Sequence, residues 1–276
     1  MTTTATTTTA STPLVRPQRT KLGWAVHDAL AVTQRNLIGY VRIPEAIFFS
    51  TLQPVMFVLL FRYVFGGAVP IKGFDYVDFL VPGIFVQTML FGCANTAIGL
   101  AEDSGKGLLE RFRSLPMARS AVLAGRTNAD TIRNVFVALL MTAVGYAVGF
   151  RVHTSFWGWL AGVVLAIAFA YALSWGFAAM AMSAPNGETA QLMTFPLIFP
   201  FTFASSAFVP VQTMPGWLQA FAVNQPVTKV VNATRALMLG GPTATPVLHA
   251  MLWTIGLLVV LAPLAVWRYR QVGGVK

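Results

Sequence analysis

The chain has 276 residues, and its composition excludes a water-soluble domain, because 56% of the residues are hydrophobic and only 10% are charged. Soluble globular domains carry about 25% charged residues, so this chain lacks the polar surface that such a fold needs. The composition also excludes a disordered chain, a coiled coil, a collagen and a disulfide-rich secreted module. An all-α integral membrane protein remains. Since Cys93 is the only cysteine, neither an internal disulfide nor a cysteine-built metal site is possible.

Residues 1–20 hold nine threonines and no acidic residue, which predicts a disordered cytoplasmic tail. A single membrane domain is expected over residues 21–276, and it opens with an amphipathic helix over 21–42. Charged residues recur at every seventh position of this helix, and apolar residues share another face. With Trp24 beside them, these faces fit a helix on the membrane surface, and docking on another protein chain is the alternative. The charged face holds Lys21, Asp28, Arg35 and Arg42, and the apolar face holds Leu22, Val26, Leu30, Thr33 and Leu37.

Six apolar stretches follow that are long enough to cross a hydrocarbon core, which takes about 20 residues. The third stretch is short, so we expect its helix to begin earlier, within residues 121–133. The fifth contains Pro196 and Pro200, each of which removes a backbone donor and bends a helix. The predicted spans are Pro44–Phe65, Phe79–Ala101, Asn134–Phe150, Trp157–Met182, Gln191–Val209 and His249–Arg268.

The net charge of +10 is explained by membrane topology. If the N-terminus is cytoplasmic, fourteen of the 19 Lys and Arg residues fall on cytoplasmic segments. Cytoplasmic loops collect Lys and Arg, so this distribution predicts a multi-pass protein of the cell membrane with both termini in the cytoplasm. No nucleic-acid partner is needed to explain the charge.

The segment between the second and third spans is too polar for a simple turn. Within 102–120, leucine and phenylalanine share one face of a short helix, charged side chains point away, and Pro116 ends it. The helix either presents a charged surface to a partner or is a plain interfacial linker. The apolar face holds Leu108, Leu109, Phe112 and Leu115, and the other holds Glu110, Arg111, Arg113 and Ser114.

Arg126, Asp130 and Arg133 share one face of the stem that enters the third span, because their spacing is i, i+4, i+7. A solvated stem held by salt bridges fits this pattern, and so does a device that relays movement into the span.

A polar and an apolar face also alternate in the outer segment 210–242, after the fifth span. Residues 216–221 are mostly apolar, and a second helix is expected to end at Gly240. Its apolar face holds Val227, Val230, Val231, Thr234 and Leu237, and its polar side holds Thr228, Asn232 and Arg235.

The order of N-terminal amphipathic helix, six spans and the loop sequence GLLERFRSLPMARS resembles the permeases of type-2 ABC exporters. The late outer segment NQPVTKVVNATRALMLGGP resembles them too, and the closest likeness is to the daunorubicin/doxorubicin-resistance permease subfamily. The resemblance implies that the loop helix is a coupling helix docked on a separate ATPase subunit, that the helix over 21–42 also touches the ATPase, and that the outer helices are re-entrant. Carried onto this sequence, the ATPase contact falls on Glu110, Arg111, Phe112, Arg113 and Leu115.

The resemblance further implies two ATPase subunits, which bind ATP and Mg, and a second permease that is identical or related. The chain itself is not expected to be an enzyme. Its one near match to a phosphate-binding loop, SGKG at 104–107, has Leu100 in place of the first Gly, Gly107 in place of Ser or Thr, and no preceding strand. We expect no catalytic residue, metal or cofactor on this chain.

Aromatic and methionine side chains in spans two, four and five would line any path through the membrane, with few hydrogen-bonding groups and no buried charge. This lining predicts a hydrophobic or amphiphilic substrate, such as a drug, an antibiotic or a lipid. The same side chains would also suit contact with membrane lipid or with a neighbouring helix. The candidate path residues are Phe91, Trp175, Met180, Phe195 and Phe199.

Two other functions stay open. Related permeases export lipid-linked polysaccharide, but each unpaired hydroxyl of a sugar in an apolar path costs roughly 1–3 kcal/mol. An ion-coupled secondary transporter usually places acidic groups at mid-membrane. All nine acidic residues of this chain lie outside the centres of the predicted spans, which disfavours ion coupling.

Overall fold

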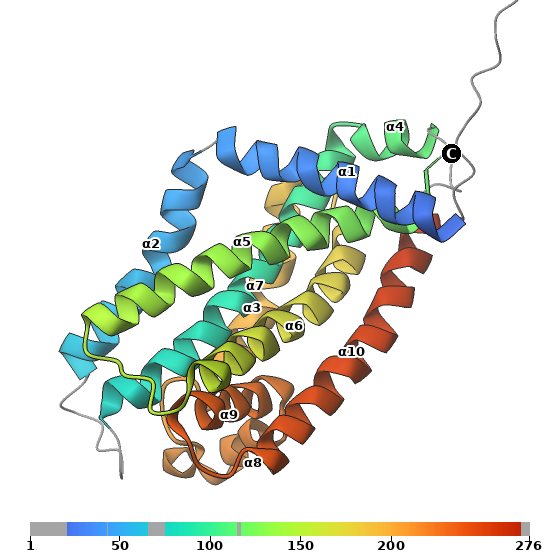
Figure 1. Ribbon diagram of the computed structural model, residues 1–276. Coiled ribbons are helices and arrows are strands. Elements are labelled where there is room, and N and C mark those ends of the chain that lie inside the picture. Colours follow the sequence, from blue (N-terminus) through green and yellow to red (C-terminus); the bar gives the residue numbers. More distant parts are fainter. Residues whose placement is uncertain (1–20, 43, 66–74, 115–116, 272–276) are drawn as a thin grey trace, which may run out of the picture.

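A computed structural model describes residues 21–42, 44–65, 75–114 and 117–271, and the tail predicted at 1–20 lies outside them. Long helices run between two ends of the molecule, with α1 and α4 at one end and α8 and α9 at the other (Figure 1). The described helices are α1 Lys21–Arg42, α2 Pro44–Leu60 with a π-helical turn Phe61–Phe65, α3 Tyr76–Gly105, α4 Leu108–Ser114, α5 Arg119–Ala147, α6 Phe156–Ala181, α7 Gly187–Phe203, a 3-10 turn Val211–Thr213, α8 Gly216–Asn224, α9 Pro226–Leu239 and α10 Ala244–Gln271. No strand occurs in these ranges.

Helix α3 is the centre of the bundle, and it packs against α2, α5, α6, α7 and α9. It is apolar nearly all round, as expected of a helix surrounded by others, and Leu80, Ile84 and Phe85 are fully buried. Helix α10 lies at the periphery (Figure 1) and exposes Leu252 and Val259. Among the described residues, α3, α6 and α10 are the helices long and apolar enough to cross a membrane by length and composition.

Two of the predicted helix boundaries are wrong. Helix α5 begins at Arg119, so the third predicted span covers only its second half, and the expected start within 121–133 is still slightly late. Helix α7 ends at Phe203 rather than at Val209. Two side chains from the start of α9 hold the turn that follows. Gln225, the residue before α9, donates to the Ala204 carbonyl, and the Thr228 hydroxyl of α9 accepts from the Ser206 amide at 3.2 Å. These distant partners satisfy backbone groups that the helix would otherwise use.

Both predicted outer helices are present, as α8 and α9, and Gly240 ends α9 with a φ of +94°. Arg235 joins α9 to the centre of the bundle. Its guanidinium lies 3.6 Å from the Phe79 ring centroid and donates to the carbonyls of Phe79 (3.0 and 3.1 Å) and Ser206 (2.8 Å). A half-buried arginine with two carbonyl acceptors fixes the end of α3 against the outer helices.

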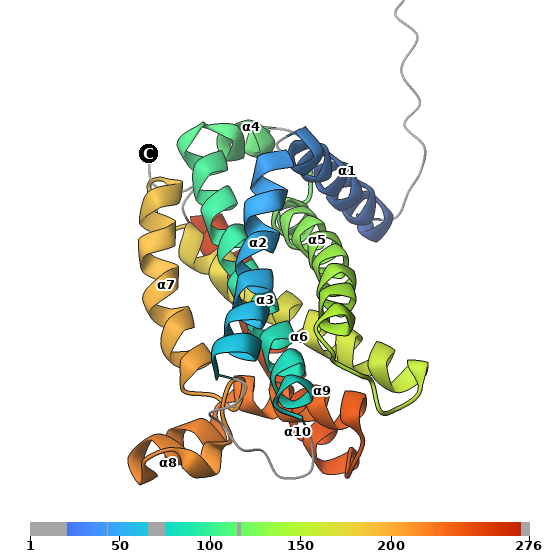
Figure 2. The same ribbon diagram turned by 90° about the vertical axis from the view of Figure 1, so that its left-hand side faces the viewer.

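Helix α1 lies across the end of the bundle and packs on α5 (Figure 2). Neither predicted face of α1 makes this contact alone. The buried stripe shares only Thr33 with the predicted apolar face and otherwise lies between the two faces, whereas Val26 and Leu30 of the apolar face are exposed. Gly125 of α5 permits the approach, since a Cβ there would lie 2.5 Å from the Val32 Cβ. The buried stripe consists of Ala29, Val32, Thr33 and Asn36.

Candidate substrate groove and ATPase-contact surface

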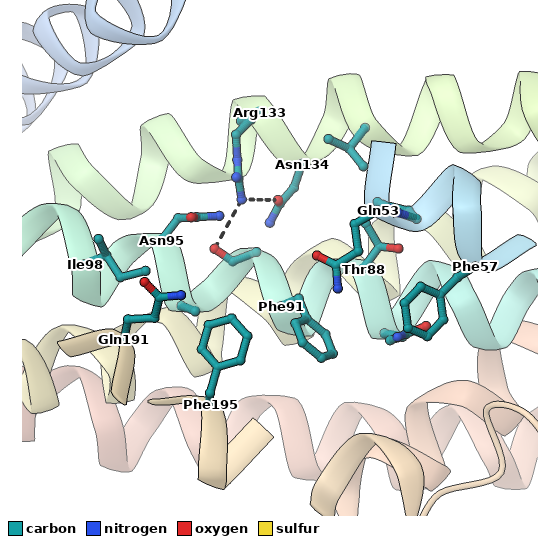
Figure 3. A pocket seen from close by; sticks show the side chains of 15 residues that line it. Gln53, Phe57, Thr88, Phe91, Asn95, Ile98, Arg133, Asn134, Gln191 and Phe195 are labelled. Atoms are coloured by element: carbon teal, nitrogen blue, oxygen red, sulfur yellow. Dashed lines mark hydrogen bonds between the residues drawn. The ribbon is translucent and has the colours of Figure 1, made fainter. Parts of the chain in front are cut away.

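A groove of about 270 Å³ lies along α3, with α5 on one side, α7 on the other and α2 at one end (Figure 3). Two of the predicted path residues line it, namely Phe91 and Phe195, whose ring centroids are 6.0 Å apart in an edge-to-face arrangement. The full lining is Gln53, Pro54 and Phe57 of α2, Gln87, Thr88, Phe91, Gly92, Ala94, Asn95 and Ile98 of α3, Arg133, Asn134 and Val137 of α5, and Gln191 and Phe195 of α7.

The groove is more polar than the sequence predicts. Gln53, Thr88 and Gln191 line it together with three aromatic rings, those of Phe57, Phe91 and Phe195 (Figure 3). Gln87 is only 3% exposed, and its side-chain oxygen has no hydrogen-bond partner among the described residues. A buried amide oxygen without a partner costs free energy, so the groove offers an unfilled hydrogen-bond acceptor. The expectation of an apolar path with few hydrogen-bonding groups is therefore wrong for this groove.

Arg133 supplies the only charge among the described residues that line the groove. Its Nη2 donates to the Gly92 carbonyl at 3.1 Å and to the Asn134 side-chain oxygen at 3.3 Å (Figure 3). With its amide oxygen turned towards the guanidinium, Asn95 accepts two further bonds, at 2.6 and 3.2 Å. Neutral acceptors thus hold Arg133 in place across α3 and α5.

Behind Arg133, Asp130 is 1% exposed, and its carboxylate joins three helices. It accepts hydrogen bonds from the Tyr40 hydroxyl of α1 and, at 2.5 Å, from the Thr96 hydroxyl of α3. Nε of Arg126 lies 3.6 Å from the same carboxylate. The interpretation of a solvated stem is therefore wrong, because these charges are enclosed by α1 and α3. The one charge among the described residues that line the groove comes from α5, a helix that the expectation about spans two, four and five did not include.

Tyr40 lies on α1, outside the long helices of the bundle, and sequence reasoning missed it. Burial, together with the neighbouring Asp130 carboxylate, raises the pKa of the Tyr40 phenol above its usual range. The phenol therefore keeps its proton and remains the donor to Asp130. Tyr40 lies near the end of an amphipathic helix, and Asp130 lies far along the chain on another helix. Nothing in the sequence indicated that these two residues would be in contact.

A line of phenylalanine rings leads from the groove towards the outer helices. Along α7, the Phe195, Phe199 and Phe203 centroids are 5.9 and 5.5 Å apart, as their i, i+4 spacing allows. The line continues to Phe208, 5.2 Å from Phe203, and to Phe61, 4.6 Å from Phe208. The spacing in α7 was visible in the sequence, but the continuation through Phe208 and Phe61 depends on the turn after α7.

The other two predicted path residues lie elsewhere. Met180 lines a separate cavity of about 520 Å³ between α3, α6, α7, α9 and α10, whose lining is almost wholly apolar. Trp175 is 6% exposed and packs edge-to-face on Tyr171 at 6.2 Å, and it lines neither cavity. Two of the predicted path residues therefore line the groove, Met180 lines the apolar cavity, and Trp175 packs between helices. Phe199 lies in the line of rings beside the groove and is exposed.

Helix α4 forms the predicted short amphipathic helix. Leu109 is buried against the bundle, Phe112 is half-buried, and the side chains of Glu110 and Arg111 are exposed. The Arg113 side chain and residue Leu115, both predicted contacts, lie outside what the structure describes.

Arg35 connects α1 to this end of the bundle, with its guanidinium 5.0 Å from the Phe112 ring centroid and 2.6 Å from the Asp103 carboxylate. Helices α1 and α4 thus form one continuous surface at this end (Figure 2).

Comparisons of the sequence with known proteins identify the family of this chain. The family model for the ABC-2 type transporter matches residues 27–239, which include α4 and all the groove helices. The daunorubicin resistance ABC transporter permease protein DrrB1 of Streptomyces coeruleorubidus is 32% identical over 98% of this chain and 99% of its own length. The probable doxorubicin resistance ABC transporter permease protein DrrC of Mycobacterium tuberculosis is 29% identical over 89% of both chains. The inner membrane transport permease YadH of Escherichia coli is 24% identical over 69% of this chain and 76% of its own. The chain belongs to the ABC-2 type transporter family.

Proposed function

We propose that this chain is the membrane-spanning subunit of an ABC exporter that moves an amphiphilic compound, such as a drug or a lipid, out of the cytoplasm or the inner leaflet. Six spans, α2, α3, α5, α6, α7 and α10, would cross the cell membrane. Two ATPase subunits would bind ATP and Mg, and a second permease, identical or related, would complete the transporter. The resistance functions named for the relatives DrrB1 and DrrC support a drug as the compound.

The groove beside Phe91 carries this proposal. It combines aromatic rings with a few polar groups, which is the usual lining of a site for a small amphiphilic molecule. The line of phenylalanine rings gives such a molecule an apolar surface from the groove to the outer helices. The network around Asp130 connects the wall of the groove to α1, at the end where α4 would meet the ATPase.

Export of lipid-linked polysaccharide is the second candidate, because the polar side chains of the groove could bind sugar hydroxyls. The volume argues for the smaller ligand. Pockets for small molecules hold about 300–1,000 Å³, and the groove lies just below this range. Ion coupling would need a carboxylate that can exchange ions, and Asp130 is instead fully engaged by Tyr40, Thr96 and Arg126.

Reversing the two exposed charges of α4 is expected to uncouple transport. In the variant Glu110→Arg, Arg111→Glu, the net charge is unchanged but the pattern offered to the ATPase is inverted, which costs affinity through like-charge contacts. Inside-out vesicles containing the permease and its ATPase should take up at least one of daunorubicin, doxorubicin or fluorescent phosphatidylglycerol with ATP, and the variant should lose this uptake.

The matched control is Glu110→Asp, Arg111→Lys, which keeps both charges and should retain uptake. If the reversed variant transports as well as this control, the ATPase contact lies elsewhere on the permease. If the wild-type complex hydrolyses ATP but takes up none of the three compounds, the proposed substrate class is wrong.

Labelling from outside the cell is expected to distinguish the two ends of the molecule. Single cysteines replace Ser114 on α4 and Trp217 on α8, both exposed, in a Cys93→Ser background. A membrane-impermeant maleimide should label the cysteine at position 217 in intact cells and that at position 114 only after lysis. Figure 1 supports this orientation, since the start of α1 and the end of α10 lie at the same end as α4. Labelling of position 114 in intact cells would reverse the topology.

A further inference from the structure

The charged network beside the groove contains two guanidinium groups, those of Arg126 and Arg133. Besides Asp130, the carboxylates of Asp103 and Glu102 interact electrostatically with Arg126. Nε of Arg126 lies 3.6 Å from the Asp130 carboxylate, whereas Arg133 has no carboxylate within 4.0 Å among the described residues. Nε of Arg133 is buried and has no hydrogen-bond partner in the described part of the chain. A charge held inside a membrane protein is expensive unless a partner or a function accounts for it.

The Arg133 guanidinium lies at the groove wall. Arg133 stands midway along α5 and faces the groove opposite Phe91 and Phe195 (Figure 3). None of the described lining residues is acidic, so the groove offers one cation, several amides and three aromatic rings. The ligand that complements this set carries a negative charge for Arg133 and an apolar or planar body for the rings.

We propose that the groove binds an amphiphile with an anionic group, a carboxylate or a phosphate, which pairs with Arg133 while its apolar body packs on Phe91 and Phe195. Asn95, Asn134 and the Gly92 carbonyl hold the guanidinium at the wall, and these partners are neutral, so the charge of Arg133 stays available to a ligand. That this ligand is a transported substrate rests on the proposed function, whereas its binding in the groove does not.

Binding is measured on the full chain in phosphatidylcholine nanodiscs, without ATPase or ATP, so that failure of transport and failure of this proposal are distinguishable. The probes are the anionic 1-pyrenebutyrate, its neutral counterpart 1-pyrenebutanol and the cationic 1-pyrenemethylamine. Binding is detected as energy transfer from the tryptophans of the protein to the pyrene, and empty nanodiscs serve as the blank. The wild-type chain should bind the anion at least about tenfold more tightly than either other probe, which is about 1.4 kcal/mol.

Arg133→Gln should abolish this preference, and Arg133→Lys should keep part of it. The matched control is Arg268→Gln, because Arg268 is the arginine that lines the apolar cavity, and this change should leave the preference intact. Equal binding of the three probes by the wild-type chain, or an anion preference that survives in Arg133→Gln, would overturn the proposal. The comparison of probes on the wild-type chain decides the matter even if Arg133→Gln does not fold.

Competition identifies the source of the anion. Displacement of 1-pyrenebutyrate by 1-oleoyl lysophosphatidate assigns the site to an anionic lipid. Displacement by 2-naphthoate but not by lysophosphatidate assigns it to a free aromatic acid. Either result supports the proposal. If neutral monoolein displaces the probe as well as lysophosphatidate does, the anionic group is not recognised and the proposal is wrong.

Discussion

Replacing Asp130 by alanine is expected to destabilise the protein by about 3–5 kcal/mol, the usual cost of breaking a buried ion pair by removing one partner. The change leaves Arg126 without its carboxylate and removes the acceptor of both the Tyr40 and the Thr96 hydroxyls. Helix α1 would then lose one of its polar links to α3 and α5, that of Tyr40. The thermal midpoint of the detergent-solubilised chain should fall, and ATP-dependent uptake into inside-out vesicles should be lost.

A variant of the neighbouring pair provides the control. Asp103→Ala removes the partner of Arg35, but Arg35 is 38% exposed, so solvent screens the pair and the expected cost is about 0–1 kcal/mol. Asp130→Asn should fall between the two, because it keeps an acceptor for Thr96 and loses the charge that balances Arg126. An Asp130→Ala variant as stable as Asp103→Ala would show that the network contributes little to the fold.

Gly83→Ala is expected to disturb the contact between α3 and the turn after α7, although it adds only one methyl group. A Cβ at position 83 would overlap the backbone carbonyl of Ala207, which cannot move aside as a side chain can. Overpacking of this kind typically costs about 1–3 kcal/mol. The displaced turn carries Ser206 and Phe208, so the bonds to Arg235 and the line of phenylalanine rings should be disturbed together.

Gly256→Ala is the matched control, because Gly256 also lies inside a long helix but nothing lies within 4 Å of a Cβ built there. This substitution should stabilise the chain slightly, since alanine is favoured over glycine in a helix interior by about 0.5–1 kcal/mol. The thermal midpoint of Gly83→Ala and its uptake of whichever of the three compounds the wild-type transports should fall, whereas Gly256→Ala should keep the uptake and raise the midpoint slightly. If Gly83→Ala is as stable and active as Gly256→Ala, the turn is more adaptable than the structure implies.

The sequence by itself determined the helical class, the amphipathic helices α1 and α4 and the outer pair α8 and α9. It also determined the family, through the loop and outer segments that later matched. These features depend on local periodicity, composition and the residues that cap helices, which are visible within one segment of the chain. The seven-residue spacing in α1 and the glycine after α9 are of this kind.

Only the tertiary structure decided which charges are buried and which cavity each aromatic residue lines. Arg126, Asp130 and Arg133 look like a solvated helical face in the sequence, and they become a buried network because α1 and α3 cover them through Tyr40 and Thr96. Phe91 and Trp175 look alike as aromatic residues of a span, yet one lines the groove and the other packs on Tyr171. Burial depends on which helices approach each other, and those approaches depend on small residues such as Gly125 and Gly83, whose partners lie far away in the sequence.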